Sequence, residues 1–541
     1  MKNAGIADAT TAFDYIVVGA GSAGCVLANR LSEDPANRVL LIECGPDDKS
    51  PLIRMPRGVG KLLDPRNPHV FAYNVAPGGN QPEEVWLKGR AMGGSSSVNG
   101  MVYMRGAPQD YDDWESAGCT GWGWDRIGKH FVALEDHILG PGTWRGVGGP
   151  LKISQQKASN PVIAALLAAG RELGVPTVPD VNDLDVVAES GMGLQVTTTW
   201  NGERFSAGRA FIDPVRARKN LSILTGKRVD RVLFDGKRAS GVIVDGRAIR
   251  CLGEIILSAG AVESPKLLEL SGIGQGERLR ALGIDVIAHS PLVGENLREH
   301  RYVAMDWRIS GHSSNQKLQG IGLISSVLRY FLRRKGPMTD AAHEVGGFIK
   351  TTPTLDRSDA QIGSMLVTMK QDESGKVALD PFPGMRLLGY FTRPESRGWT
   401  HATTPDPAAQ PEVHANHFAE EIDRRTAINI FKWIRRFGHQ EALVPWIVKE
   451  IGFGATVRTD EDIAANLLQL GGTSFHIAGT AAMGRDENSV VDPQLRVRGI
   501  EGLRVCDTSI MPTLVSGNTN GPAMAIAMNA ADFILRKDTA Q

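Results

Sequence analysis

Residues 14–43 read DYIVVGAGSAGCVLANRLSEDPANRVLLIE, and this stretch decides the first part of the fold. The apolar run ending at Val18 predicts a strand, which leads directly into a segment with three glycines, Gly19, Gly21 and Gly24. A helical pattern follows, and a second apolar run ends at Glu43. The stretch therefore predicts a β–α–β unit of the kind that binds dinucleotides.

Each glycine of this unit has a physical reason. Gly19 permits the tight turn, Gly21 lets the backbone approach a pyrophosphate, and Gly24 lets the helix pack on the strand. The helix N-terminus then offers unpaired N–H groups to the anion. Glu43 ends the second strand, where a carboxylate accepts hydrogen bonds from ribose hydroxyls. This motif does not distinguish NAD from FAD.

Residues 89–100 form a second glycine-rich segment, GRAMGGSSSVNG. Its amides and hydroxyls could surround a phosphate and the polar edge of a ring. The segment runs directly into the apolar residues 101–104, which argues against a flexible linker. We therefore interpret it as a second part of a nucleotide site.

The composition excludes several classes of protein. A chain of 541 residues is long enough for two or more structural units, and 60 basic residues balance 60 acidic ones. This zero net charge argues against a general nucleic-acid binder. No apolar run approaches the ~18 residues of a transmembrane helix, and residues 1–10 lack the apolar segment of a signal peptide. The five cysteines have no metal or redox spacing, so we expect a cytoplasmic protein without a metal site.

Together, the two glycine-rich segments and several later motifs resemble the glucose–methanol–choline (GMC) oxidoreductases, which are FAD-dependent alcohol oxidases and dehydrogenases. The likeness covers roughly residues 13–300 and 396–535 and is thin over 301–395. The blocks that carry it are 89–103, 260–274, 293–297, 475–480, 505–512 and 517–522.

The resemblance implies an α/β fold with two domains. A Rossmann-like FAD-binding domain would combine residues 13–155, 221–300 and 471–541. A substrate domain with an antiparallel sheet and flanking helices would combine residues 156–220 and 301–470. Within the second domain, we interpret Arg333-Arg334-Lys335 as the solvated end of a helix.

The resemblance also implies which residues hold FAD. Some relatives attach FAD covalently through a histidine in the second glycine-rich segment, but the corresponding residue here is Val98, so we expect non-covalent FAD. The predicted cofactor contacts are Gly19, Gly21, Ser22, Ala23, Gly24, Glu43, Arg90, Met92, Gly93, Gly94, Ser95, Asn99, Gly100, Met101, Val102, Val229, Ala259, Gly260, Asp507, Thr508, Asn518 and Thr519. An alternative role for Asp507 is simply to cap a turn.

Oxidation of an alcohol removes a hydride from the carbinol carbon and a proton from the hydroxyl. Neutral histidine suits the role of base because its ordinary pKa is about 6.5. The resemblance assigns this role to His476 and makes Asn518 its partner, while Phe475 and Val102 are expected to line the substrate pocket. The last helix, expected from about Pro522 to Arg536, could direct its positive N-terminus at the flavin.

The substrate and the electron acceptor are less defined. An aromatic or medium-chain aliphatic alcohol is our first expectation, and choline, a sugar or another polyol is the alternative. The acceptor could be O₂ or an unknown carrier, and no motif assigns an oligomeric state.

Proteins of other classes fit the sequence less well. A serine hydrolase requires Gly-x-Ser-x-Gly, and no serine here has glycine on both sides at that spacing. His343-Glu344 lacks the second histidine of a zinc protease. An NAD(P) dehydrogenase would explain the first β–α–β unit but not residues 89–103 or 471–522. A non-catalytic flavin-binding protein would leave His476 and Asn518 without a purpose.

Overall fold

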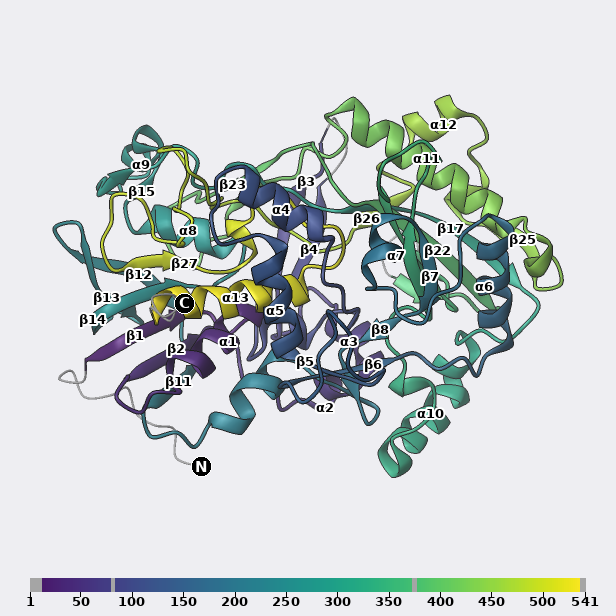
Figure 1. Ribbon diagram of the computed structural model, residues 1–541, viewed down its shortest axis with the longest axis horizontal. Coiled ribbons are helices and arrows are strands. Elements are labelled where there is room, and N and C mark those ends of the chain that lie inside the picture. Colours follow the sequence, from purple (N-terminus) through teal and green to yellow (C-terminus); the bar gives the residue numbers. More distant parts are fainter. Residues whose placement is uncertain (1–11, 79–82, 372–376, 536–541) are drawn as a thin grey trace.

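The computed structural model describes residues 12–78, 83–371 and 377–535. The N-terminal residues 1–10 and Arg536, on which two of the predictions above depend, lie outside them. Figure 1 shows two large sheets side by side, the first at the left and the second at the right. The mixed α/β fold predicted from the sequence is confirmed.

The first sheet contains the predicted β–α–β unit. Strand β1 (Phe13–Val18) leads into helix α1 (Ser22–Leu31), which leads into β2 (Val39–Glu43). Strands β11 (Leu221–Thr225), β2, β1, β14 (Arg247–Leu257) and β27 (Leu503–Val505) pair in parallel in this order. The sheet is completed by the antiparallel strands β12 (Val229–Asp235) and β13 (Arg238–Val244).

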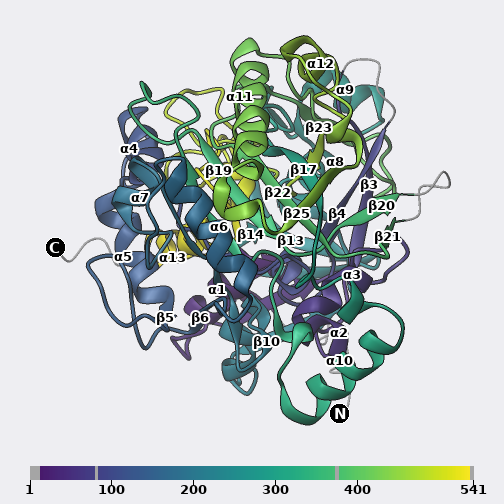
Figure 2. The same ribbon diagram turned by 90° about the vertical axis from the view of Figure 1, so that its right-hand side faces the viewer.

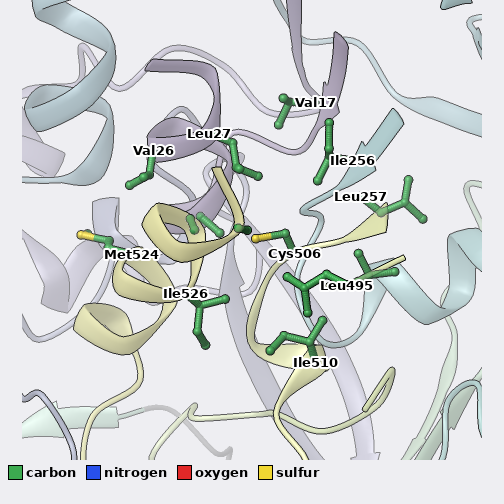
Figure 3. Close-up of a cluster of buried hydrophobic side chains, with 14 of the residues drawn as sticks. Val17, Val26, Leu27, Ile256, Leu257, Leu495, Cys506, Ile510, Met524 and Ile526 are labelled. Carbon is green, nitrogen blue, oxygen red and sulfur yellow. The ribbon is translucent and has the colours of Figure 1, made fainter. Parts of the chain in front are cut away.

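Two helices from opposite ends of the chain cover this sheet. Helix α1 packs against α13 (Asn520–Ile534), although nearly 500 residues separate them in the sequence. Figure 3 shows their apolar side chains meeting those of the strands, with Leu27 near Val17 and Ile256, and Met524 beside Ile526. This packing holds the N-termini of both helices at the same end of the sheet, where β1 and β14 finish.

The second sheet is antiparallel, as the sequence predicted. Its order is β25 (Ile447–Ile451), β17 (Arg301–Ile309), β22 (Gly384–Phe391), β19 (Ala360–Met365), β18 (Val345–Ile349) and β7 (Gly191–Leu194). The short strand β26 (Gly471–Thr473) also pairs with β17. Helix α11 (Glu421–Gly438) packs on β17 and β22, and α6 (Pro161–Glu172) packs on β18 and β7.

A smaller sheet joins the two halves of the molecule. Strands β3 (Val70–Ala76) and β4 (Glu84–Gly89) pair with β24 (Glu412–His414) and β23 (Trp399–His401). The remaining longer helices are α4 (Pro108–Ser116), α5 (Trp124–Leu134), α8 (Glu263–Leu270) and α10 (Gly320–Arg333). As interpreted from the sequence, Arg333 ends a helix, and Arg334 caps it in the left-handed region.

Residues 301–395, where the family resemblance is thin, contribute regular strands to the expected antiparallel sheet, and β17 alternates strictly, with Val303, Met305 and Trp307 buried. Helix α13 begins at Asn520, two residues before the expected start near Pro522, and the preceding Thr519 makes no side-chain cap hydrogen bond. In the described part of the chain, no helix combines the length and apolarity needed to cross a membrane.

Candidate active site

A cavity of about 1600 Å³ lies where the two large sheets meet. Its walls include the ends of β1 and β14, the N-termini of α1 and α13, and residues of β17, β19 and β22. Ordinary ligand pockets measure roughly 300–1,000 Å³. The cavity is therefore large enough for a cofactor and a substrate together.

Most of the residues predicted to bind cofactor line this cavity. They are Gly19, Gly21, Ser22, Ala23, Glu43, Gly94, Ser95, Asn99, Gly100, Met101, Val102, Val229, Ala259, Gly260, Asp507, Thr508, Asn518 and Thr519. The remaining four do not line it. Gly24 packs against Gly19, Arg90 lies over the ring of Phe71, Met92 is in the core, and Gly93 donates a hydrogen bond to Ala20.

The two glycine-rich segments form a backbone surface, called the glycine cradle below, on which there is no room for side chains at several positions. A Cβ on Gly24 would lie 1.9 Å from the carbonyl oxygen of Gly19, and one on Gly94 would lie 2.6 Å from the Cα of Gly21. The two segments therefore touch through their backbones. At Gly260, where φ is +90°, a Cβ would meet no atom within 4 Å and would project into free space. Such a surface suits the close approach of a dinucleotide.

The buried carboxylate of Glu43 lies in the same wall. It accepts hydrogen bonds from the backbone N–H groups of Ala20 (2.9 Å) and Gly45 (2.8 Å). Burial raises the pKa of Glu43, and these two bonds oppose the shift. The carboxylate is thus held in one orientation at the end of β2, with room to accept bonds from a ribose.

Asp507 caps a turn, which was the alternative role expected for it, and it also lines the cavity. One carboxylate oxygen caps the turn by accepting from the Ser509 N–H group at 2.8 Å. The other accepts from the Gly260 N–H group at 2.8 Å and from the Ser264 hydroxyl at 2.6 Å. These hydrogen bonds link Asp507 to the segment that follows β14.

His476 and Asn518, 42 residues apart in sequence, meet at the cavity wall. The Nε2 atom of His476 lies 2.9 Å from the Nδ2 atom of Asn518. On its other side, the Nδ1 atom of His476 lies 3.0 Å from the Nδ1 atom of His300. The Nε2 atom of His300 in turn lies 2.9 Å from the backbone carbonyl oxygen of Thr392.

The hydrogen-bond network assigns the protons of both imidazoles. A carbonyl oxygen can only accept, so His300 carries its proton on Nε2 and accepts at Nδ1. His476 must then carry its proton on Nδ1, which leaves its Nε2 atom unprotonated and able to accept a proton or a hydrogen bond.

A second chain of hydrogen bonds leads to the same assignment. The Tyr390 hydroxyl donates to Gln361 Oε1 (2.5 Å), and Gln361 Nε2 donates to Asn518 Oδ1 (3.0 Å). These bonds turn the amide of Asn518 so that its N–H group faces His476. An N–H donor facing Nε2 again requires that this nitrogen be unprotonated.

Burial keeps both histidines neutral. It lowers the pKa of His300 to about 4, and it holds the pKa of His476 well below its usual value, helped by His300 and Lys88. The ring of Tyr390 stacks on His300, with centroids 4.6 Å apart. The imidazole of His476 is therefore in its neutral, proton-accepting form at neutral pH.

Two buried side chains, Glu299 and Lys88, support the turn that carries His476. One carboxylate oxygen of Glu299 accepts from the backbone N–H groups of Ser474 (3.1 Å) and His476 (3.0 Å). The Lys88 ammonium group donates to the carbonyl of Phe475 (2.8 Å), whose φ is +62°. A phenylalanine in this left-handed region is strained, and the hydrogen bonds of Lys88 and Glu299 to the backbone hold the turn in place.

Sequence reasoning did not find four of these residues. Lys88, His300, Gln361 and Tyr390 all belong to strands or strand ends that approach His476 only in the folded chain. Glu299 and His300 stand two residues after the block 293–297 that carries the family resemblance, and this was the one available signal. Phe475 and Val102 line the cavity, as predicted for the substrate pocket.

Comparison with known proteins agrees with this geometry. A GMC oxidoreductase N-terminal model matches residues 13–302, and a GMC oxidoreductase C-terminal model matches residues 394–527. An alcohol dehydrogenase [acceptor] from Pseudomonas putida is 37% identical, over 97% of this chain and 96% of that protein. The mitochondrial choline dehydrogenase of Homo sapiens is also 37% identical, over 96% of this chain and 89% of that protein.

A solved structure supports the same assignment. It is an R554A variant of the formate oxidase of Aspergillus oryzae RIB40, studied for modification of its FAD. The two structures superpose with a TM-score of 0.90 at 25% identity, over 98% of this chain and 99% of that one. The two family models and the relatives aligned along nearly the whole chain show that this protein belongs to the GMC oxidoreductases, FAD-dependent enzymes that oxidise CH–OH groups.

Proposed function

We propose that this enzyme oxidises an apolar primary or secondary alcohol to its aldehyde or ketone, with His476 as the base. The observation that carries the proposal is the 2.9 Å separation of His476 Nε2 and Asn518 Nδ2 at the cavity wall. One of these atoms can accept a proton and the other can donate a hydrogen bond, which is the pair that a hydroxyl group requires.

FAD, when bound, accepts the hydride from the carbinol carbon. The glycine cradle, Glu43 and Asp507 are the residues that would hold it. We propose non-covalent binding, since Val98 lines the cavity where a histidine tether would be needed. The N-terminus of α13 also reaches the cavity through Asn518, Thr519 and Asn520, so its positive end faces the same space.

Asn518 and His476 have different roles toward the hydroxyl group of the substrate. Asn518 donates from Nδ2 to the substrate oxygen, and His476 accepts the hydroxyl proton at Nε2. Proton transfer then makes His476 cationic, and His300 stabilises that cation by accepting from its Nδ1 proton. Gln361 keeps the Asn518 amide in the donating orientation throughout.

The lining of the cavity supports an apolar substrate. From β17 to β22 it consists mainly of apolar side chains, among them Leu323, Met365, Val367, Leu379 and Leu388. Among the described lining residues, every acidic one lies outside that stretch: Glu43, Asp64, Glu263 and Asp507. An aromatic or medium-chain aliphatic alcohol fits such a surface.

Choline is the second candidate substrate. The human choline dehydrogenase is 37% identical to this chain, the same identity as the Pseudomonas putida alcohol dehydrogenase. The described residues that line the cavity from β17 to β22 include no carboxylate, so the trimethylammonium group of choline would have to bind to aromatic rings. Tyr302, Tyr390 and Phe475 line the cavity and could supply them through cation–π contacts.

The domain division remains part of the proposal. A cofactor domain of residues 13–155, 221–300 and 471–541 and a substrate domain of 156–220 and 301–470 would each contain one large sheet. Strand β26, which follows the proposed boundary at residue 471, pairs with β17 of the proposed substrate domain, so the two domains would be in contact just before His476.

The visible spectrum of the purified protein tests this function. Alcohols are added without oxygen, and air is then readmitted. Bleaching by apolar alcohols but not by choline supports the proposal, and bleaching by choline alone overturns the substrate class. Rapid recolouring in air identifies O₂ as acceptor, and slow recolouring identifies another carrier. A yellow protein that no alcohol bleaches would contradict the catalytic assignment.

A further inference from the structure

Helix α10 stands out from the body of the protein at the lower right of Figures 1 and 2. One side of it is attached to the body through Ser326 and Tyr330, which are buried. Tyr330 packs with Met55 and Met338 in a small apolar cluster of its own. The opposite side has no covering element in the described part of the chain.

That opposite side is strongly apolar. Five large side chains follow one face of the helix with exposed fractions between 52% and 85%: Ile321, Ile324, Leu328, Phe331 and Leu332. At 100° per residue they span an arc of roughly 100°. Scattered exposed apolar side chains are normal on a soluble protein, but a continuous stripe of this kind marks an interaction surface.

The positive charge of residues 317–335 favours an anionic partner. Residues 317–335 contain five cations and no acid, in a chain whose net charge is zero. The cations are Lys317, Arg329, Arg333, Arg334 and Lys335. Arg329 and Arg333 follow the apolar arc along one edge of the helix. An apolar face bordered by cations fits the boundary between headgroups and acyl chains of an anionic bilayer. Arg334 pairs with Glu203 at 3.4 Å. A second copy of the same helix would add its other four cations to the four of the first copy, which disfavours self-association through this face.

The helix also borders the mouth of the active-site cavity. Leu323 and Val327 line the cavity from the inner side of α10, and Phe331 both lines it and is 52% exposed. Leu63 and Val377 share this double position, so they too lie at the opening. We propose that α10 binds the enzyme peripherally to an anionic membrane surface, with the cavity opening toward the lipid.

The helix lies on the membrane in this proposal and does not cross it. Fourteen residues of α-helix measure about 21 Å, less than the ~30 Å hydrocarbon core of a bilayer. Apolar alcohols or an apolar electron acceptor dissolved in the bilayer would reach the cavity without passing through water.

Co-sedimentation of the FAD-loaded full chain with vesicles tests the proposal. We expect binding to vesicles of equal parts phosphatidylcholine and phosphatidylglycerol, weaker binding to pure phosphatidylcholine, and loss of the difference at high salt. The double variant Ile324→Glu with Leu332→Glu should bind at least about tenfold more weakly. Neither residue lines the cavity, so turnover of a water-soluble alcohol should be unchanged.

A matched control shows whether loss of binding comes from the apolar face of α10 or from the added negative charge alone. Val444 and Val448 are 64% and 56% exposed on another surface, and the double glutamate variant there should bind vesicles like the wild type. Arg329→Gln with Arg333→Gln should weaken the preference for anionic lipid, because it removes two of the five cations of the segment. Equal vesicle binding by both glutamate variants overturns the proposal, as does failure of the wild type to bind. Wild-type dimers that the α10 variant converts to monomers, without vesicle binding, would also overturn it and assign the face to a second copy.

Discussion

The Nδ1 atoms of His476 and His300 lie 3.0 Å apart, and this contact determines which nitrogen of His476 carries the proton. His300 is held by the carbonyl of Thr392, so it can only accept from His476. The result is a directed chain of hydrogen bonds that leaves Nε2 free at the cavity wall. His300 does not line the cavity, so we interpret it as a positioning residue.

Replacing His476 by alanine should leave FAD bound and reduce alcohol turnover by about 10²–10⁴-fold, as expected for loss of a general base. FAD content by absorbance and kcat/KM by steady-state kinetics measure the two effects. His439→Ala, at an exposed histidine that contacts Glu450, should retain full activity. Near wild-type turnover in His476→Ala would remove it from this role.

Replacing His300 should test its effect on the tautomer of His476. His300→Phe keeps the ring against Tyr390 but removes the acceptor, and kcat should fall by about 10–100-fold because a buried N–H group loses its partner. His300→Asn offers an oxygen near the same position and should lose less than about tenfold. Equal losses in kcat for the two variants, with unchanged KM, would refute the tautomer argument.

Buried neutral His300 also predicts a pH dependence of stability. Its pKa is about 4 in the folded state and about 6.5 when unfolded, so the unfolded chain binds the proton first as the pH falls. Folding free energy from this residue is therefore lost below pH 6.5, by about 2 kcal/mol at pH 5. Urea denaturation at pH 7 and pH 5 should show a smaller loss in His300→Phe than in the wild type. An identical loss in both would contradict the pKa shift.

Asn518→Asp should raise the pKa of His476, because a carboxylate beside the imidazole favours its charged form. Activity requires the neutral base, so the acid limb of the kcat/KM profile should move to higher pH, and the loss should be larger at pH 6 than at pH 8. Asn518→Ala serves as the comparison, since it removes the donor without adding charge. Parallel profiles in the two variants would exclude the electrostatic explanation.

Glu43→Gln should weaken FAD binding by about tenfold or more, because a charged acceptor of ribose hydrogen bonds becomes neutral. Titration of the apoprotein with FAD measures the dissociation constant. The chemistry of the fraction that keeps FAD should be spared, since Glu43 lies at the end of β2 away from His476. Asp34→Asn, on the exposed turn before β2, is the control. Equal FAD affinities in the two variants would show that Glu43 does not bind the ribose.

The amino-acid sequence alone was sufficient for the nucleotide half of the molecule. Residues 14–43 form a continuous local unit, and their strand, turn and helix signals depend on neighbours within a few positions. The same is true of His476 and Asn518, which stand in compact motifs that could be recognised without coordinates.

Tertiary structure decided what surrounds the base. His300, Tyr390, Gln361 and Lys88 lie 86 or more residues from His476, and strand pairing between β17, β22 and β19 brings the first three together. The proton positions follow from the Thr392 carbonyl, which no side-chain pattern reveals. The exposed face of α10 also required the fold, because an apolar stripe in a sequence predicts burial unless the packing leaves it uncovered. Local signals determine elements and motifs, and contacts between distant strands determine the electrostatics of the site.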